Sequence, residues 1–410
     1  MGTLLDGFSA KPLKDVHVVY DAKSIRYVGS ADDSPPADLL NPGQAQPDVE
    51  LRDFTLLPGL IDAHAHLFLE GGELDFEKRH AYLKQTPKEL LRAAHQRLEK
   101  LVRIGVIAIR DAGDKHGVGL ALSELYGRED NALMPYVDSP GAAIHHKGNY
   151  GGFMAEPIEN HASLKDCIES RIRAGADRIK LIATGNIDFR EGRVTQEPQM
   201  SAQEVAELVN AAKGFGKQTF AHASGDAGIE HVIAGEVDSV EHGFFIRDDQ
   251  LARMRDQQIA WVPTFAPVQK QIDHAERLGW DERVISNLRK ILEQHAASLV
   301  KAHEMGVRII AGSDAGSYGV THGLGFLDEL ELMERAGLPA LAVINAATGN
   351  SSERLGYKEN FGQIRPGYRS RFILTRYSPL EGITNLRNDK QIVFDGTVYD
   401  STANIDATGL

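Results

Sequence analysis

Short apolar runs alternate with longer amphipathic segments between residues 54 and 354. The runs are about five residues long, as buried strands are, and the segments between them carry apolar residues at helical spacing. The runs lie in "LLPGLIDAH", "VIAIRDAG", "MPYVDSPGAA", "RIKLIATG", "QTFAHASG", "VDSVEHG", "IAWVPTF" and "VRIIAGSDAG". Eight strands that alternate with helices predict an α/β fold, a parallel sheet closed into a (β/α)8 TIM-like barrel.

The two ends of the chain follow a different pattern. Residues 1–53 contain short β-rich runs and a loop rich in Pro and Gly, and residues 355–410 return to β character. We expect the two ends to fold together as one small β-sandwich domain. The predicted barrel domain then comprises residues 54–354.

Composition narrows the partners of this fold. A chain of 410 residues is long for one hydrophobic core, but α/β barrels are an exception. The net charge of −13 and the lack of a basic cluster argue against nucleic acid and anionic membranes, and no apolar run is long enough to span a bilayer. We therefore expect a small-molecule substrate and leave a homo-oligomer open.

The same sequence bears on the compartment. One cysteine, Cys167, excludes an intrachain disulfide and fits a reducing environment. The N-terminal residues lack the basic and apolar regions of a signal peptide. We expect a cytoplasmic protein.

Metal-competent side chains stand at the carboxyl ends of the predicted strands, where barrels of this class place their active sites. They are His64 and His66 on the first strand, Lys180 on the fourth, His222 on the fifth, His242 on the sixth and Asp314 on the eighth. Residues two apart on a strand point to the same side, so the two histidines of the first strand can face one ion. Imidazole and carboxylate groups are ligands of Zn²⁺ and similar ions, and the pattern predicts a metal site.

Lys180 is unexpected, because its neighbours Ile179, Leu181 and Ile182 form an apolar strand. A buried ammonium must be paired, solvated at the strand end or chemically altered. A carboxylate such as Asp188 is one candidate partner.

"LPGLIDAHAH" (57–66) resembles the signature of the amidohydrolase superfamily, and the Lys, His, His and Asp of the later strands follow the order of that superfamily. The resemblance extends to the flanking β-rich segments. "IKLIATG" and "SDAG" are most similar to the branch of imidazolonepropionase-like proteins, Xaa-Pro dipeptidases and related carboxypeptidases or amidases.

The resemblance implies a binuclear centre, with His64, His66 and Asp314 at one ion and His222 and His242 at the other. It also implies that Lys180 is carboxylated by CO₂ and that its carbamate bridges two divalent metal ions, Zn²⁺ foremost, with Mn²⁺, Fe²⁺ or Co²⁺ as alternatives. A hydroxide shared by the metals would attack an amide-type carbonyl while Asp314 shuttles the proton to the leaving nitrogen. The expected substrate is a dipeptide or N-acyl amino acid, followed by an aryl amide, carbamate or urea-type compound.

Three alternatives compete with this reaction. A lactonase or esterase would use the same metal centre, and the ligand set does not separate it from an amidase. A mononuclear deaminase is the second alternative. Deaminases of the superfamily have an H-x-x-E motif after the fifth strand, but in "HASG" Gly225 stands where that Glu would be. A non-catalytic interaction module would have lost ligands that are intact here.

Substrate contacts are expected in the loops that follow the strands. His145 and His146 lie in "AAIHHKGNYGG" after the third strand, and Tyr318 and His322 follow the eighth. Arg190 and Arg193, after the fourth strand, are candidates to meet a substrate carboxylate. Five other histidines fall in predicted helices and are expected at the surface: His80, His95, His274, His295 and His303.

Overall fold

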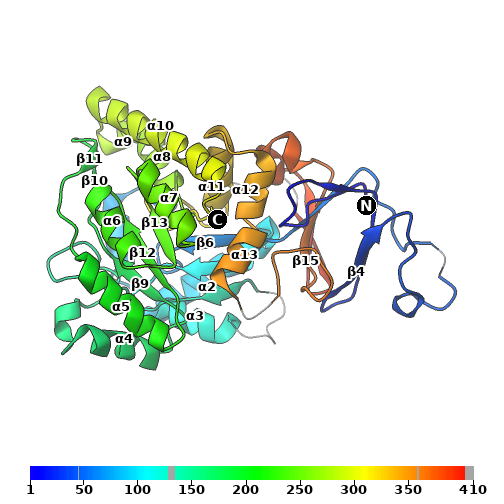
Figure 1. Cartoon of the computed structure of the whole chain (residues 1–410), viewed down its shortest axis with the longest axis horizontal. Helices are drawn as coiled ribbons and strands as arrows, with labels where there is room; N and C mark the ends of the chain where they lie inside the picture. The colour runs from blue at the N-terminus through cyan, green and yellow to red at the C-terminus, as the bar shows by residue number, and fades with distance from the viewer. Residues whose placement is uncertain (45, 128–133, 358–359, 402–410) are drawn as a thin grey trace.

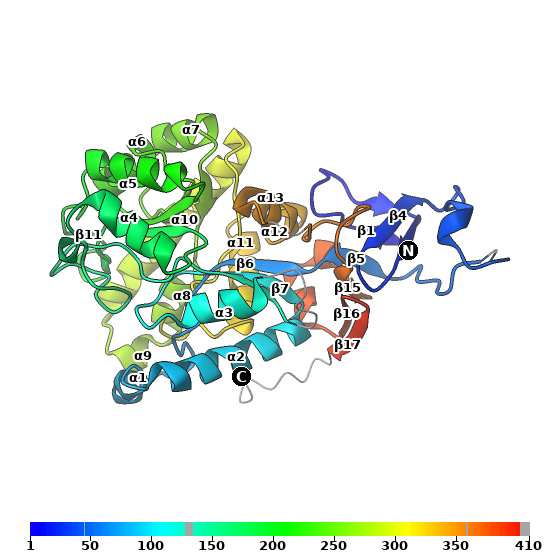
Figure 2. The same ribbon diagram turned by 90° about the horizontal axis from the view of Figure 1, so that it is seen from below.

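The computed structural model describes residues 1–44, 46–127, 134–357 and 360–401. A larger lobe, in which helices surround short strands, lies beside a smaller β-rich lobe that holds the N-terminus (Figure 1). A view turned by 90° shows the same separation of helical and β-rich regions (Figure 2).

Short parallel strands form the inside of the larger lobe. One sheet has the order β6 (Leu60–Ala65), β7 (Val106–Asp111) and β8 (Tyr136–Asp138). The other has the order β9 (Ile179–Ile182), β12 (Thr219–Ala223), β13 (Ser239–His242) and β14 (Ala260–Val262). All their residues are buried, which explains why the strands appear in the sequence as continuous apolar runs. The mixed α/β architecture is confirmed.

Isolated β-bridges connect the two sheets. They pair Ile144 with Leu181 of β9, Trp261 of β14 with Ile309, and Ala315 with Ala65 of β6. The eighth predicted strand is therefore an extended segment held by single bridges. In the described residues the strands follow one another around a ring, but continuous ladders do not close it.

Helices follow the strands and cover them from outside (Figure 1). Their bounds are α1 (Phe76–Tyr82), α2 (Pro87–Ile104), α3 (Val118–Tyr126), α4 (Leu164–Arg173), α5 (Ala202–Gly214), α6 (Asp226–Ala234), α7 (Asp248–Asp256), α8 (Ala266–Asp273), α9 (Ala275–Leu278), α10 (Glu282–Met305), α11 (Leu324–Arg335), α12 (Ala340–Ala346) and α13 (Gly349–Leu355). Short 3₁₀ helices are η1 (Ala37–Leu39), η2 (Ile158–Asn160), η3 (Pro379–Glu381) and η4 (Ile383–Arg387).

Helix α2 illustrates how local sequence sets these bounds. Thr86 and Glu89 form a reciprocal capping box at its N-terminus, and Pro87 occupies the first turn, where its missing N–H costs nothing. Gly105 ends the helix with a φ of 94°, in the left-handed region that favours glycine.

Both ends of the chain contribute to one six-stranded sheet. Its order is β17 (Thr397–Ser401), β16 (Lys390–Phe394), β15 (Arg371–Thr375), β5 (Thr55–Pro58), β1 (Thr3–Leu4) and β2 (Leu13–Lys14). Two hairpins stand apart from it, β3 (Val16–Tyr20) with β4 (Ile25–Ser30), and β10 (Ile187–Asp188) with β11 (Arg193–Val194). Strand β5, which lies just inside the segment predicted as barrel, is central to this sheet and leads into β6.

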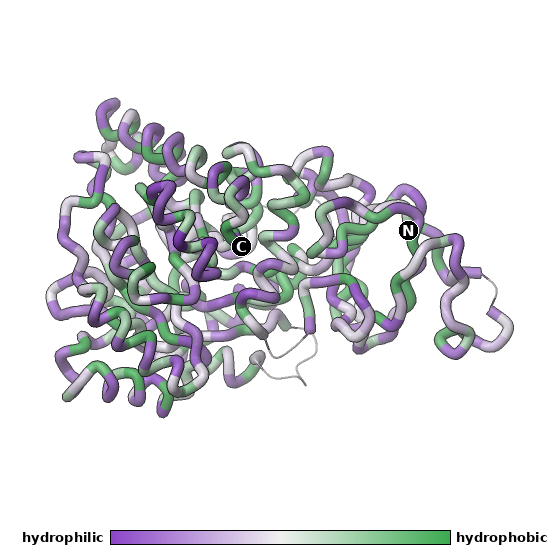
Figure 3. The backbone as a smooth tube through the Cα atoms, in the orientation of Figure 1, coloured by the Kyte–Doolittle hydropathy of each residue, from purple (hydrophilic) through white to green (hydrophobic). Residues whose placement is uncertain are grey.

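The helices of the larger lobe alternate between hydrophilic and hydrophobic positions along their turns, as helices covering a core do (Figure 3). Among the described residues, no helix has both the length and the apolar character needed to cross a membrane.

The surface prediction for His295 of α10 is wrong. Its side chain is buried, its ring stacks on Phe244 at 4.0 Å, and its Nε2 donates to the Pro263 carbonyl at 2.9 Å.

Candidate metal centre

The predicted ligand side chains line one cavity of about 290 Å³. They come from four strands and the segment after Ile309: His64 of β6, His66 just beyond it, Lys180 of β9, His222 of β12, His242 of β13, and Asp314. The structure thus brings together side chains that are up to 250 residues apart in the sequence.

His64, His66 and Asp314 form the tightest cluster. The Nε2 atoms of His64 and His66 lie 3.5 Å and 3.4 Å from the same oxygen, Oδ1 of Asp314. His64 Nε2 is buried and has no hydrogen-bond partner among the described residues. An unsatisfied buried nitrogen is costly, and a divalent cation would satisfy it. The cluster therefore fits a metal ion.

Hydrogen bonds fix which ring nitrogens can bind a metal. His64 Nδ1 contacts the Glu241 carboxylate at 2.6 Å, and His66 Nδ1 contacts the Gly113 carbonyl at 3.4 Å. Both partners only accept, so each Nδ1 carries the proton and each Nε2 offers its lone pair. In His222 the roles are reversed, because its Nε2 donates to a backbone carbonyl at 3.3 Å.

His222 and His242 lie together on the second side of the cavity. Their ring centroids are 4.5 Å apart, and the ring of His242 is 5.1 Å from that of His64. His242 Nδ1 is hydrogen-bonded to the Thr264 hydroxyl at 2.7 Å, which leaves Nε2 for the cavity. A second ion at these two rings stays a prediction.

Burial keeps these imidazoles neutral. It lowers the pKa of His64 to about 4 and that of His222 to about 3, and the nearby charge of Lys180 adds to both effects. Burial likewise puts the pKa of His242 well below its ordinary value. Neutral imidazole is the form that binds a metal, so no proton must be removed at neutral pH.

Asp314 is held in an unusual backbone conformation. Its φ is 54°, and its backbone N–H donates to the His64 carbonyl at 2.7 Å. Its second carboxylate oxygen, Oδ2, accepts from Ser317 Oγ at 2.9 Å. Burial alone would raise its pKa, but the neighbouring histidines, His66 foremost, lower it. Such strained, partnered residues cluster at functional sites.

Lys180 also faces this cavity and is buried. Its Nζ lies 4.7 Å from the centre of the Phe220 ring. Burial lowers the pKa of Lys180 to about 8, and the charge of Glu241 partly offsets that effect. The alternative partner, Asp188, is not in the cavity lining; its carboxylate accepts backbone N–H groups of its own turn.

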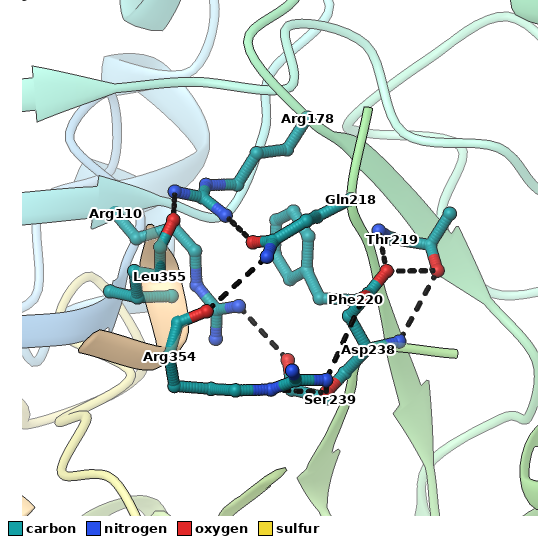
Figure 4. A pocket seen from close by; sticks show the side chains of 9 residues that line it. All are labelled: Arg110, Arg178, Gln218, Thr219, Phe220, Asp238, Ser239, Arg354 and Leu355. Atoms are coloured by element: carbon teal, nitrogen blue, oxygen red, sulfur yellow. Dashed lines mark hydrogen bonds and ion pairs between the residues drawn. The ribbon is translucent and has the colours of Figure 1, made fainter. Parts of the chain in front are cut away.

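A buried ion pair that the sequence analysis missed supports His64 from behind. Glu241 Oε2 accepts from His64 Nδ1 and, at 2.7 Å, from the guanidinium of Arg110. Arg110 also donates to Ser239 Oγ at 2.9 Å, and Figure 4 draws this bond as a dashed line. Burial alone would raise the pKa of Glu241, but Arg110 and the His64 hydrogen bond lower it to about 2. The signal was present in "VEHG", where only the histidine was considered.

Replacing Glu241 by Gln should weaken metal binding about 10–100-fold, because the charged acceptor that orients His64 is lost. Competition with a metal-sensitive chelating dye measures this affinity directly. Glu353→Gln is a matched control, since Glu353 pairs with Arg308 at the surface and contacts no predicted ligand. Equal affinity in Glu241→Gln and the control would contradict this role.

The predicted substrate-binding residues His145 and His146 follow β8 but lie outside the cavity lining. Both ring nitrogens of the buried His145 face backbone carbonyls, those of His146 at 2.9 Å and Ala155 at 3.1 Å. The ring of His146 contacts Glu159 at 2.8 Å and Glu204 at 3.2 Å. Their side chains stabilise the loop in this structure.

The other two candidates follow the eighth predicted strand. Tyr318 lines the cavity, stacks on Phe76 at 5.3 Å, and donates its hydroxyl hydrogen to the Leu74 carbonyl at 3.1 Å. His322 is buried outside the lining and its Nε2 donates to the His66 carbonyl at 3.1 Å. A substrate contact stays a prediction for Tyr318.

The loop after β8 contributes a cavity residue that the sequence analysis did not name. Tyr150 lines the cavity, with its ring 5.2 Å from that of His222, and it shares a hydrogen bond with the side chain of Asn186. Burial raises its pKa, so it remains a neutral donor. Gly151, with a φ of 121°, makes the turn that follows it. The glycines around this tyrosine in "GNYGG" were the available signal.

The α/β fold and the histidine–carboxylate cluster at its strand ends are those of a metal-dependent hydrolase, and the family match identifies the C–N bond as the kind of bond it cleaves. The chain belongs to the amidohydrolase family, whose family model matches residues 55–398.

Relatives and solved structures are similar to this chain over most of its length. An uncharacterized protein of Mycobacterium tuberculosis is 24% identical over 349 residues, covering 84% of this chain and 85% of the relative. A crystal structure of a Xaa-Pro dipeptidase with bound methionine is 25% identical, with a TM-score of 0.79, covering 97% of this chain and 98% of that one. Ochratoxinase of A. niger shares the fold at 23% identity, with a TM-score of 0.78, covering 100% and 97%.

Proposed function

We propose that this protein is a binuclear metal-dependent amidohydrolase that cleaves an amide-type C–N bond of a small molecule. The observation that supports this most is the convergence of His64, His66, Lys180, His222, His242 and Asp314 on one cavity. We also propose that the ring of strands is a (β/α)8 barrel, the scaffold that places these side chains at one end.

His64, His66 and Asp314 would hold one ion, and His222 and His242 the other, with Lys180 between them as a carbamate. Two divalent ions, Zn²⁺ foremost, would supply an activated water at neutral pH and polarise the scissile carbonyl. The neutral Nζ of Lys180 would form a bond to the carbon of CO₂ while one C=O π pair moves to oxygen, and the nitrogen would release one proton to water, which leaves a carbamate anion. Burial favours this step, because it lowers the pKa of the amine to about 8 and so enlarges the neutral fraction.

Asp314 would move the proton of the reaction. Its Oδ1 faces the cavity beside His64 and His66, while Ser317 holds its Oδ2 at 2.9 Å. This carboxylate would accept a proton from the attacking water and return it to the leaving nitrogen, first as base and then as acid. The Tyr150 hydroxyl, a neutral donor at the cavity wall, would donate a hydrogen bond to the carbonyl oxygen of the substrate.

Carbamylation is tested by replacing Lys180 with Met. After incubation with ¹³C-bicarbonate and Zn²⁺, the unchanged protein should show a carbamate signal in its ¹³C NMR spectrum and bind about two metals per chain. Lys180→Met should lose the signal and bind about one. Lys390→Met is the matched control, because burial also lowers the pKa of Lys390 to about 8, in strand β16. A carbamate signal that persists in Lys180→Met would contradict the assignment.

The reaction itself is tested by a hydrolysis screen of the metal-supplied protein. One set of substrates tests C–N cleavage and contains dipeptides, N-acyl amino acids, aryl amides, carbamates and ureas. The second set contains esters and lactones, because the same metal centre would also cleave C–O bonds. We expect the C–N set to be cleaved and chelation to remove the activity. Cleavage confined to esters or lactones, or turnover unaffected by chelation, would overturn the proposal.

A further inference from the structure

We infer that the substrate of this site is uncharged and carries apolar groups on both sides of the scissile bond, rather than the carboxylate of a dipeptide or N-acyl amino acid. The inference rests on the proposed amide hydrolysis and narrows its substrate to neutral amides, carbamates or ureas. Three features of the cavity support it: its apolar walls, the charges of its lining, and the partners of the cations around it.

Apolar side chains form two separate walls of the cavity. The Met154 wall consists of buried Met154 and Ile182 with the partly buried rings of Tyr150 and Phe153. The Phe244 wall consists of buried Phe244 and Val268 with partly buried Ile187 and Phe189. The two walls belong to different hydrophobic clusters, and the lining also includes the predicted metal ligands. We infer that the two walls receive different apolar parts of a substrate whose reacting bond lies at the metals.

The lining offers little to a substrate carboxylate. Among the described residues that line the cavity, Lys180 is the cationic side chain, and it is assigned to the metals. The uncharged polar side chains are Tyr150, Asn186, Ser224, Gln271, Ser317 and Tyr318, and the Tyr318 hydroxyl already donates to the Leu74 carbonyl. A carboxylate leaving water for such surroundings needs a cation or several N–H donors in return.

Cations close to the cavity already have partners. The Arg79 guanidinium, near Tyr318, donates to backbone carbonyls that include Gly316 at 3.1 Å. Lys270, beside Gln271 on α8, lies 2.9 Å from Asp328 and 3.2 Å from Asp273. These groups would have to give up their contacts before they could bind a substrate carboxylate.

Two arginines that the sequence analysis considered for that role are also outside the lining. Arg190 is exposed and its guanidinium lies over the Trp280 ring, 5.3 Å from its centre. Arg193 is exposed on β11. The similar Xaa-Pro dipeptidase was solved with methionine, which has a carboxylate, in its active site. We infer that this chain differs from that relative in the substrate group it accepts.

The inference is tested with two amides that differ by one carboxylate, N-acetylphenethylamine and N-acetylphenylalanine. With Zn²⁺ supplied, kcat/KM for the neutral amide should exceed that for the carboxylate by at least about tenfold, which corresponds to about 1.4 kcal/mol of transition-state stabilisation. The opposite preference, or equal values, would overturn the inference.

Binding separates this inference from the proposed reaction. Calorimetric titration of the metal-supplied protein with each amide gives a preference that does not depend on turnover. Tighter binding of the neutral amide without cleavage of either would support the substrate class and contradict the proposed hydrolysis. Tighter binding of the carboxylate would overturn the substrate class whether or not hydrolysis occurs.

A cation added to the lining provides the converse test. Gln271 lies on α8 and its Oε1 accepts from Trp280 at 3.2 Å. Gln271→Arg should lower the ratio of kcat/KM for the neutral amide to kcat/KM for the carboxylate about tenfold. Gln271→Met adds no charge and should leave this ratio unchanged. An unchanged preference in Gln271→Arg with full metal content would show that charge in the lining does not select the substrate, and the inference would fail.

Discussion

Asp314→Asn should reduce the turnover of a cleaved amide by on the order of 10³-fold, within the range found for a general acid–base residue. The amide of Asn cannot accept the proton of the attacking water or return it to the leaving nitrogen. The change preserves the shape of the side chain, so Ser317 can still donate to its oxygen. Single-turnover kinetics on the metal-supplied variant measure the chemical step apart from product release.

Two controls make this result specific. Metal content, measured by atomic emission, should stay close to that of the unchanged protein, because the histidines remain. Asp249→Asn makes the same chemical change at the surface, where Asp249 pairs with Arg247, and should leave turnover unaltered. Full activity in Asp314→Asn with both metals present would rule out its part in proton transfer.

Arg110→Met should destabilise the metal-free protein by about 3–5 kcal/mol, because it leaves the charge of Glu241 buried with only part of its hydrogen bonding. Both side chains are almost fully buried, at 2% and 0% exposure. Arg110 also donates to the Ala63 carbonyl at 2.6 Å, in the strand that carries His64. Urea unfolding followed by circular dichroism measures the loss.

Two further variants show whether the loss of stability comes from breaking a buried ion pair or from removing any arginine. Arg308→Met removes one partner of the exposed Arg308–Glu353 pair and should cost no more than about 1 kcal/mol. Adding Glu241→Leu to Arg110→Met should recover much of the stability, since no unpaired charge remains. A loss in Arg110→Met as small as that in Arg308→Met would mean that the pair contributes little.

The sequence predicted the positions of the ligands well because parallel α/β topology brings strand ends together. Knowing that His64, His222 and His242 end strands was enough to expect a common cavity. The roles of these residues in binding two metals stay a prediction. The eighth strand was harder, because the segment around Ile309 is held by single bridges and no continuous ladder forms there.

Other features depended on contacts between distant segments, which a pattern along the chain does not contain. His295 sits on a helical face with ordinary spacing, and only the packing of Phe244 against it shows that it is buried. In the sequence, Arg110 and Glu241 are charged residues of two separate strands, and only the fold shows that they form an ion pair. The loop histidine His145 bonds to its own loop, whereas its neighbour Tyr150 reaches the cavity.

The pairing of β5 with both β1 and β15 has a consequence for biosynthesis. As the nascent chain emerges from the ribosome, β5 can join β1 at once, but its partner β15 is made roughly 300 residues later, about 15–60 s at ordinary elongation rates. Strand β6, which begins two residues after β5, carries His64 and enters the larger lobe. The six-stranded sheet is therefore completed only late in translation, after the last predicted ligand, Asp314, has already been made.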